Sequence, residues 1–365
     1  MSREEGYGGR RHRAIELELF ANRFRGVVWQ MGETLRRTAL SVNVKERLDF
    51  SCGLLDGDGR LVVNAPHIPV HLGALGPCVR SVVARLELAP GDVAVTNHPA
   101  YGGSHLPDVT VITPVWTARS GAAGADPPLA FLASRAHHAE IGGSRPGSMP
   151  PGASCLAEEG VVLEPQLLVD GGRPRWDELR AQLAGGPFPS RAVEENLVDL
   201  EAAVAANRQG VAALAALADE HGEHRLREWM TALARHAADQ ARGVLSRLPR
   251  GRFAASEELD DGTPLVVEVT TRRDGARFDF SGTGGVHPGN LNATPAVVRS
   301  AILYVLRLLV EESLPLNEGL LVPVEIEIPA GILNPDFSGP PETAPAVVGG
   351  NVETSQRLVD TLLKA

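Results

Sequence analysis

The sequence contains very little lysine and cysteine. Its two lysines, Lys45 and Lys364, do not follow a glycine-rich loop, so the chain lacks the phosphate-binding lysine of a P-loop. Its three cysteines include no Cys-x-x-Cys pair, which argues against a cysteine-based zinc or redox site and predicts buried thiols in a reducing compartment. These absences exclude the commonest nucleotide-binding and cysteine-based chemistries from this chain.

Long apolar segments and an excess of positive charge are also missing. Lysine and arginine number 35 against 45 acidic residues, a formal net charge of -10, so we expect neither a nucleic acid nor a membrane as partner. Residues 1–13 are polar without an apolar core, which predicts a flexible tail and not a signal peptide. The most apolar run, residues 296–310, is interrupted by Arg299 and Arg307, as in a packed helix. We therefore expect a cytoplasmic protein.

The order of apolar patterns predicts an α+β fold, and 365 residues suffice for two or three packed units. Apolar residues recur at helical spacing from Ile15 to Leu35, which predicts a first helix that ends before Ser41. Short apolar runs typical of strands follow, and two long helices are expected after the glycine- and proline-rich residues 185–190. The expected domains are a tail over residues 1–13, a helix and β-rich metal-site unit over 14–185, a helical pair over 186–250, and a mixed strand and helix unit over 251–365.

Two histidine-containing segments, residues 101–108 and 135–143, flank a predicted β-hairpin. Residues 109–116 and 129–134 have the β-branched, aromatic and apolar content of paired strands. The residues between them are rich in Gly, Ala, Asp and Pro, which indicates a loop. Antiparallel pairing places the start of the first strand beside the end of the second, so the two segments should meet.

The residues that should meet there are His105, Asp108 and His137. Imidazole and carboxylate are the ligands that borderline divalent metals prefer, and three protein ligands leave the open position that a catalytic metal needs. Asp49 is a candidate fourth ligand because it opens another predicted strand, although spacing alone does not locate it. The alternative is that histidines beside Gly-Gly and Pro only satisfy turn backbone.

Four further residues are secondary candidates. His138 and Glu140 are expected to orient His137 or to shuttle a proton as catalytic residues. His67 and His71 have the i, i+4 spacing of ligands on one face of a helix, but Pro66 and Pro69 make an extended or turn conformation more probable there. They are candidates for lining the active site on the substrate side. The alternative for this pair is structural hydrogen bonding.

Seven segments of the chain, taken in order, resemble the hydantoinase B/oxoprolinase family, and the resemblance runs from Ala14 to Ala365. Within the family, residues 96–105 are more similar to the 5-oxoprolinase branch than to the N-methylhydantoinase or acetone carboxylase branches. The seven segments are residues 45–51, 67–73, 103–108, 135–143, 146–151, 279–284 and 349–357.

The resemblance implies a divalent metal, Zn or Mn, bound by residues that match Asp49, His105, Asp108 and His137. It also implies an ATP-using partner of the hydantoinase A/oxoprolinase type that phosphorylates a lactam oxygen, while metal-activated water opens the ring of 5-oxoproline or a hydantoin. The expected protein is thus a cyclic amide hydrolase in a hetero-oligomer, with ATP bound by the partner and not by this chain.

Two alternatives remain from the resemblance. One is the metal subunit of an ATP-dependent ketone carboxylase, since the branches share most motifs. The other is a truncated, non-catalytic scaffold for the kinase-like subunit. Family members usually continue beyond the last residue of this sequence, so the resemblance implies that the C-terminal unit is incomplete.

Overall fold

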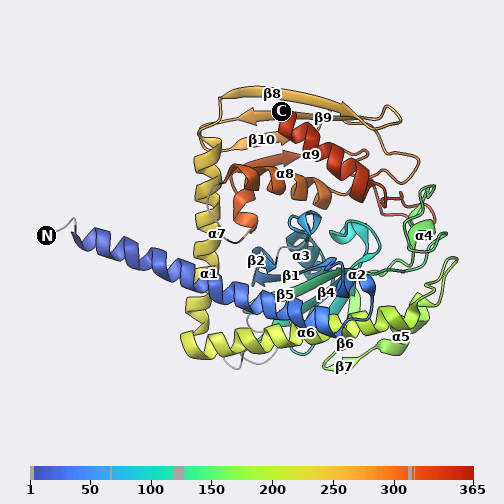
Figure 1. Cartoon of the computed structure of the whole chain (residues 1–365), viewed down its shortest axis with the longest axis horizontal. Helices are drawn as coiled ribbons and strands as arrows, with labels where there is room; N and C mark the ends of the chain where they lie inside the picture. Colours follow the sequence, from blue (N-terminus) through green and yellow to red (C-terminus); the bar gives the residue numbers. More distant parts are fainter. Residues whose placement is uncertain (1–3, 66–67, 118–126, 311–314, 316) are drawn as a thin grey trace.

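The computed structural model of the chain describes residues 4–65, 68–117, 127–310, 315 and 317–365 (Figure 1). It combines helices with two separate β-sheets, which confirms the predicted α+β class. Across these ranges, no helix has both the length and the apolar character that a membrane crossing requires.

The first sheet has seven strands in the order β2-β1-β5-β4-β3-β6-β7, and each pairs antiparallel with its neighbours. Its central strands β4 and β5 are the two arms of the hairpin that the sequence predicts, and β4 is buried along its whole length. The strands span β1 (Phe50–Asp56), β2 (Leu61–Ala65), β3 (Val93–Thr96), β4 (Asp108–Val115), β5 (Ala130–His137), β6 (Gln166–Asp170) and β7 (Arg173–Pro174).

Helices cover both faces of this sheet. On one face, α1 (Glu4–Thr38) and α6 (Val193–His221) pack against the strands and against each other. On the other face, α3 (Leu75–Arg85) packs on alternate side chains of the central strands, including Ile112 and Ala133. Because side chains alternate along a strand, every second residue of β4 and β5 points toward α3.

The second sheet has four strands in the order β11-β10-β9-β8, with a parallel pair between β10 and β11. Helices α8 and α9 pack on it, and α7 runs from the first sheet toward the second (Figure 1). These elements span α7 (Glu223–Leu245), β8 (Gly251–Glu258), β9 (Pro264–Thr271), β10 (Ala276–Asp279), α8 (Pro295–Leu309), β11 (Val324–Glu327) and α9 (Ser355–Lys364).

Short elements complete the fold, and several of them carry or support the candidate site. The α-helical ones are α2 (Val42–Lys45), α4 (Leu156–Glu159) and α5 (Trp176–Leu183). The remaining turns of helix are η1 (Pro69–His71), η2 (Pro99–Tyr101), η3 (Glu318–Leu321) and η4 (Gly350–Thr354).

The first helix departs from the sequence prediction at one end. It ends at Thr38, before Ser41 as predicted, but it begins at Glu4, so residues 4–13 are helical where we expected a flexible tail. Extending an existing helix costs little once its first turns are anchored, and this explains how a polar segment continues it. The predicted helical pair is present as α6 and α7, with Gly222 at a φ of 84° between them. Most of the predicted loop 117–128 lies outside the described residues.

Two buried acidic side chains bind segments that are distant from them in the sequence. Glu318 of η3 accepts hydrogen bonds from Nη1 and Nη2 of Arg80, at 2.9 and 3.0 Å, and from the Leu61 backbone N–H at 2.9 Å. Glu159 of α4 accepts the backbone N–H groups of Val347 and Val348, both at 2.8 Å, through Oε1. Among the residues that the structure describes, its Oε2 has no hydrogen-bond partner.

The Glu159 carboxyl predicts a pH-dependent stability. Burial raises its pKa from 4.5 to about 8. Between about pH 4.5 and about pH 8, the Glu159 carboxyl stays protonated in the folded state but is ionised in the unfolded state. The stability that the protonated carboxyl contributes is therefore complete below about pH 4.5 and is lost as the pH rises through about 8. We expect Glu159→Gln, which stays neutral, to gain about 1 to 4 kcal/mol relative to the wild type between about pH 5 and about pH 8.5. Urea unfolding of both proteins across this range measures the difference.

The matched control is Glu201→Gln on the exposed face of α6. Its unfolding free energy should follow the wild type at every pH. Parallel pH curves for Glu159→Gln and the wild type would contradict the assignment of a neutral Glu159.

Candidate metal centre

The site lies at one end of the β4–β5 hairpin. Asp108, the first residue of β4, pairs directly with His137, the last residue of β5. Both side chains lie on the face of the sheet that α3 covers, since they are an even number of residues from Ile112 and Ala133. His105 belongs to the turn that enters β4, where its carbonyl accepts the Asp108 backbone N–H at 3.1 Å.

The structure brings His105, Asp108 and His137 together. One ligand atom from each lies within 4.8 Å of the others. His105 Nδ1 is 3.1 Å from Asp108 Oδ2, and His137 Nδ1 is 3.5 Å from Asp108 Oδ1. His105 and Asp108 are 1% exposed, whereas the His137 side chain is 16% exposed, so solvent reaches the cluster from the His137 side.

The electrostatics of the cluster favour the metal-binding protonation state for Asp108 and His105, but not for His137. Burial alone would raise the pKa of Asp108, but the imidazoles of His105 and His71 hold it well below its usual range, so it is a carboxylate. Burial lowers the pKa of His105 despite the opposing effect of Asp108, so its imidazole is neutral. For His137, burial would lower the pKa, but the nearby carboxyl groups of Asp108 and Asp49 raise it overall.

Two buried atoms of the cluster lack partners. Within the described part of the chain, neither His105 Nε2 nor Asp108 Oδ1 has a hydrogen-bond partner. Buried polar atoms without partners are costly and rare in proteins, unless they bind a water or an ion. The carboxylate accepts only, so the neutral His105 ring directs its Nδ1–H to Asp108 and leaves an electron pair on Nε2. A nitrogen and an oxygen thus present lone pairs, and this donor set suits a borderline divalent cation.

Asp49 lies on the solvent side of the cluster. Its Oδ2 is 3.9 Å from His137 Nδ1, its side chain is 28% exposed, and its carbonyl accepts the His137 backbone N–H at 2.9 Å. The preceding Leu48 has a φ of 55°, which is rare for a branched side chain and turns the chain sharply into β1. Asp49 is therefore next to the three-residue cluster but outside the group whose ligand atoms lie within 4.8 Å.

The two histidines expected on the substrate side have different outcomes. His67 lies outside the described residues. His71 is 1% exposed, with Nε2 3.2 Å from Asp108 Oδ2 and Nδ1 3.0 Å from Ser51 Oγ. Both ring nitrogens of His71 are engaged inside the protein, whereas the sequence placed this residue on the substrate side. It is a hydrogen-bond partner of a candidate ligand.

His138 and Glu140 do not support His137 as the sequence suggested. Strand alternation turns His138 to the opposite face, where its Nδ1 is 3.1 Å from Asn196 Oδ1 of α6. Glu140 accepts the Gly142 and Gly147 backbone N–H groups at 2.7 and 2.8 Å and pairs with Arg191 at 3.0 Å. Through these contacts the two residues brace α6 and the loop after β5, and their expected catalytic role stays a prediction.

Sequence reasoning also missed Arg135, a fully buried cation two residues before His137. Its Nε donates to Thr110 Oγ1 at 2.7 Å, and its Nη2 donates to the Gly102 carbonyl at 2.9 Å. Gly102 has a φ of 82°, and a Cβ there would lie 2.6 Å from the Cys78 backbone nitrogen. Arg135 therefore holds the tight turn that leads to His105. The two-residue spacing from His137 was the signal for their shared face.

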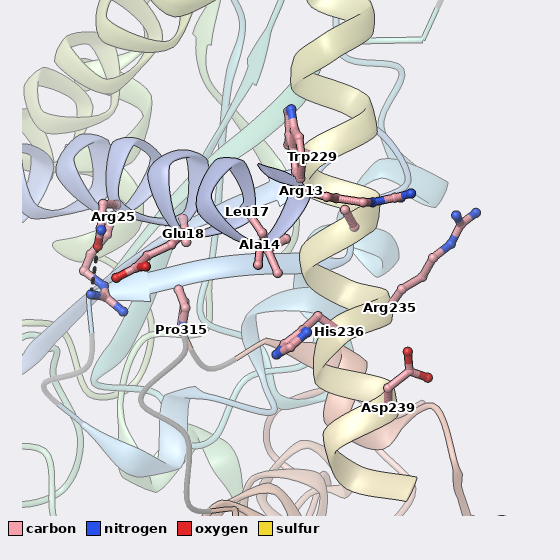
Figure 2. Close-up of a pocket in the computed structure, with 13 residues that line it drawn as sticks. Arg13, Ala14, Leu17, Glu18, Arg25, Trp229, Arg235, His236, Asp239 and Pro315 are labelled. Carbon is pink, nitrogen blue, oxygen red and sulfur yellow. Dashed lines mark hydrogen bonds between the residues drawn. The ribbon is translucent and has the colours of Figure 1, made fainter. Parts of the chain in front are cut away.

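A cavity lies away from the histidine and aspartate cluster. It measures about 660 Å³ and opens between α1 and α7, where Leu17, Trp229 and His236 are among its lining residues (Figure 2). Arginine and acidic side chains surround it, but none of the candidate metal ligands lines it. The chemistry that the histidine and aspartate cluster can perform is therefore separate from this cavity.

Comparison with known proteins gives matches that cover most of this chain. The chain is 43% identical to the 5-oxoprolinase of Saccharomyces cerevisiae over 366 residues, which cover 96% of this chain and 27% of that protein. It superimposes on the ATP-dependent caprolactamase of Pseudomonas jessenii with a TM-score of 0.83 and 25% identity, covering 96% of this chain and 59% of the other.

A nucleotide-free acetone carboxylase shares the fold, with a TM-score of 0.79 and 19% identity over 93% of this chain and 46% of that one. The chain thus spans only part of each of these proteins. Residues 13–365 match the hydantoinase B/oxoprolinase family. Because this match covers nearly the whole sequence, the chain belongs to the hydantoinase B/oxoprolinase family.

Proposed function

We propose that this chain is the metal-dependent hydrolytic component of an ATP-dependent lactam hydrolase that opens 5-oxoproline or a hydantoin. The observation that carries the proposal is the buried cluster of His105, Asp108 and His137, with two lone pairs that no described residue satisfies. The substrate class comes from the similarity to the yeast 5-oxoprolinase and to the Pseudomonas caprolactamase.

The proposed metal ligands are Asp49, His105, Asp108 and His137, and the proposed ion is Zn²⁺ or Mn²⁺. Such an ion supplies Lewis-acid chemistry, because it polarises a bound oxygen and makes water acidic near neutral pH. Asp108 contributes the negative charge and His105 a neutral nitrogen. Substrate would approach from the side of Asp49 and His137, because only this side of the cluster is exposed.

The proposed hydrolysis depends on activation by a partner. An unstrained lactam is a poor electrophile with a poor leaving group, and transfer of a phosphoryl group to its oxygen makes the ring carbon reactive toward water. Because Lys45 and Lys364 are not in a P-loop, we propose that a hydantoinase A/oxoprolinase-type subunit or domain binds the ATP. A hetero-oligomer in the cytoplasm remains the prediction.

The metal proposal is tested by elemental analysis of the purified protein after dialysis. We expect one Zn or Mn per chain in the wild type and at least about tenfold less in His105→Ala, which removes a ligand. His138→Gln is the matched control, since this neighbouring buried histidine faces Asn196 and should retain the metal. Equal metal content in all three proteins, or none in the wild type, would contradict the proposed centre.

The reaction is tested with the chain combined with its ATP-using partner. The complex should release the ring-opened amino acid from 5-oxoproline or hydantoin only when ATP is present. His105→Ala should lower this rate by at least about a hundredfold, because the group that activates water is lost. ADP formation serves as the control for an intact partner and should not require His105.

A product that forms only with a ketone and bicarbonate would instead identify a carboxylase. The likeness to acetone carboxylase concerns the fold alone and does not favour that reaction here.

A further inference from the structure

The two oxygens of the Asp108 carboxylate have very different surroundings. Oδ2 accepts a hydrogen bond from Ser104 Oγ and lies 3.2 Å from His71 Nε2 and 3.1 Å from His105 Nδ1. Oδ1 has no hydrogen-bond partner among the described residues, and the nearest ion-pair contact is His137 Nδ1 at 3.5 Å. One oxygen is therefore fully occupied by protein, and the other is available.

The two ring nitrogens of His71 contact Asp108 on one side and Ser51 on the other. A carboxylate can only accept, so the 3.2 Å contact to Asp108 requires a proton on His71 Nε2. The other ring nitrogen, Nδ1, shares a hydrogen bond with Ser51 Oγ at 3.0 Å. A chain of hydrogen bonds thus connects Ser51 through His71 to Asp108. All three side chains are at most 1% exposed, so water does not compete with it.

Contacts from the second unit fix the turn that carries His71. Ser300 of α8 donates to the Val70 carbonyl at 2.5 Å and accepts the Gly73 backbone N–H at 3.0 Å. The approach is so close that a Cβ on Gly73 would lie 2.4 Å from the Ser300 backbone nitrogen. These contacts flank His71 on both sides and leave its ring little freedom to turn away from Asp108.

We propose that Ser51 and His71 are positioning residues: Ser51 orients His71, and His71 binds Oδ2 of Asp108 and so helps to reserve Oδ1 for the metal. This inference rests on the proposed metal centre. His71 is neither a ligand nor a substrate contact in this arrangement, because both of its ring nitrogens are already bonded. Groups that orient a ligand in this way typically contribute about 10- to 100-fold to metal affinity.

The test is the affinity of the purified chain for Zn²⁺, measured by competition with a chromophoric chelator. We expect His71→Leu and Ser51→Ala to weaken binding by about 10- to 100-fold. His71→Gln should recover part of the loss, because its amide can donate to Asp108 in place of Nε2. Ser134→Ala is the matched control, since this buried serine on β5 has no hydrogen-bond partner among the described residues and should bind like the wild type.

A double-mutant cycle separates the chain of hydrogen bonds from general destabilisation. If Ser51 acts through His71, Ser51→Ala should have no further effect on Zn²⁺ affinity in the His71→Gln protein. The unfolding temperature of each metal-free variant shows whether the fold is preserved, and Ser51→Ala and His71→Gln are conservative enough to replace His71→Leu if that variant fails to fold.

The outcomes distinguish this inference from the proposed function. Suppose that the wild type binds Zn²⁺ and that Ser51→Ala and His71→Gln bind it with the same affinity, or that their losses of affinity add in the double variant. Either result would overturn the positioning role and leave the metal centre standing. A wild-type chain that does not bind Zn²⁺ or Mn²⁺ would overturn both.

Discussion

A single buried carboxylate, Asp108, is the group on which the arrangement of the site depends. Removing an ionised carboxylate from water is costly unless hydrogen bonds and neighbouring positive or polarised groups compensate. Here the compensation comes from a serine and three imidazoles that converge on one residue from three segments of the chain. The low pKa of Asp108 follows from this convergence. Burial lowers the pKa of His105 and outweighs the opposing effect of Asp108.

The surrounding fold brings these groups together because it joins one β-hairpin with η1, which is distant from it in the sequence. The β4–β5 hairpin and the turn before it provide His105, Asp108 and His137. Helix α3 covers this face of the sheet, and η1 brings His71 against Asp108. The buried side chains of Glu159 and Glu318 then join this unit to later segments of the chain, at Val347 and at η3. Polar contacts, and not only apolar burial, therefore determine how the two units meet.

The sequence predicted the parts of the site that depend on local pattern. Strand-like residues around a glycine-rich loop were enough to pair Asp108 with His137, and the structure confirms that hairpin. His138 follows His137 in the sequence, but strand alternation sends neighbouring residues to opposite faces, and its ring lies beside Asn196.

Ser51 and His71 could not have been assigned from sequence, since they meet only through the pairing of β1 with β5 and the docking of η1. Arg135 lies between these cases. Its two-residue spacing from His137 indicates a common face, but no local pattern reveals that it holds the Gly102 turn.

The hydrogen bonds between Ser300 and the turn around His71 affect how the protein folds. The hairpin ligands lie between residues 105 and 137 and can meet after closure of a short loop, whereas Ser300 and Val70 are separated by 230 positions. Closing a longer loop costs more chain entropy, and contacts of high sequence separation form more slowly. The ligand cluster is therefore expected to assemble first in a loosely oriented form, and to acquire its final geometry only when α8 docks.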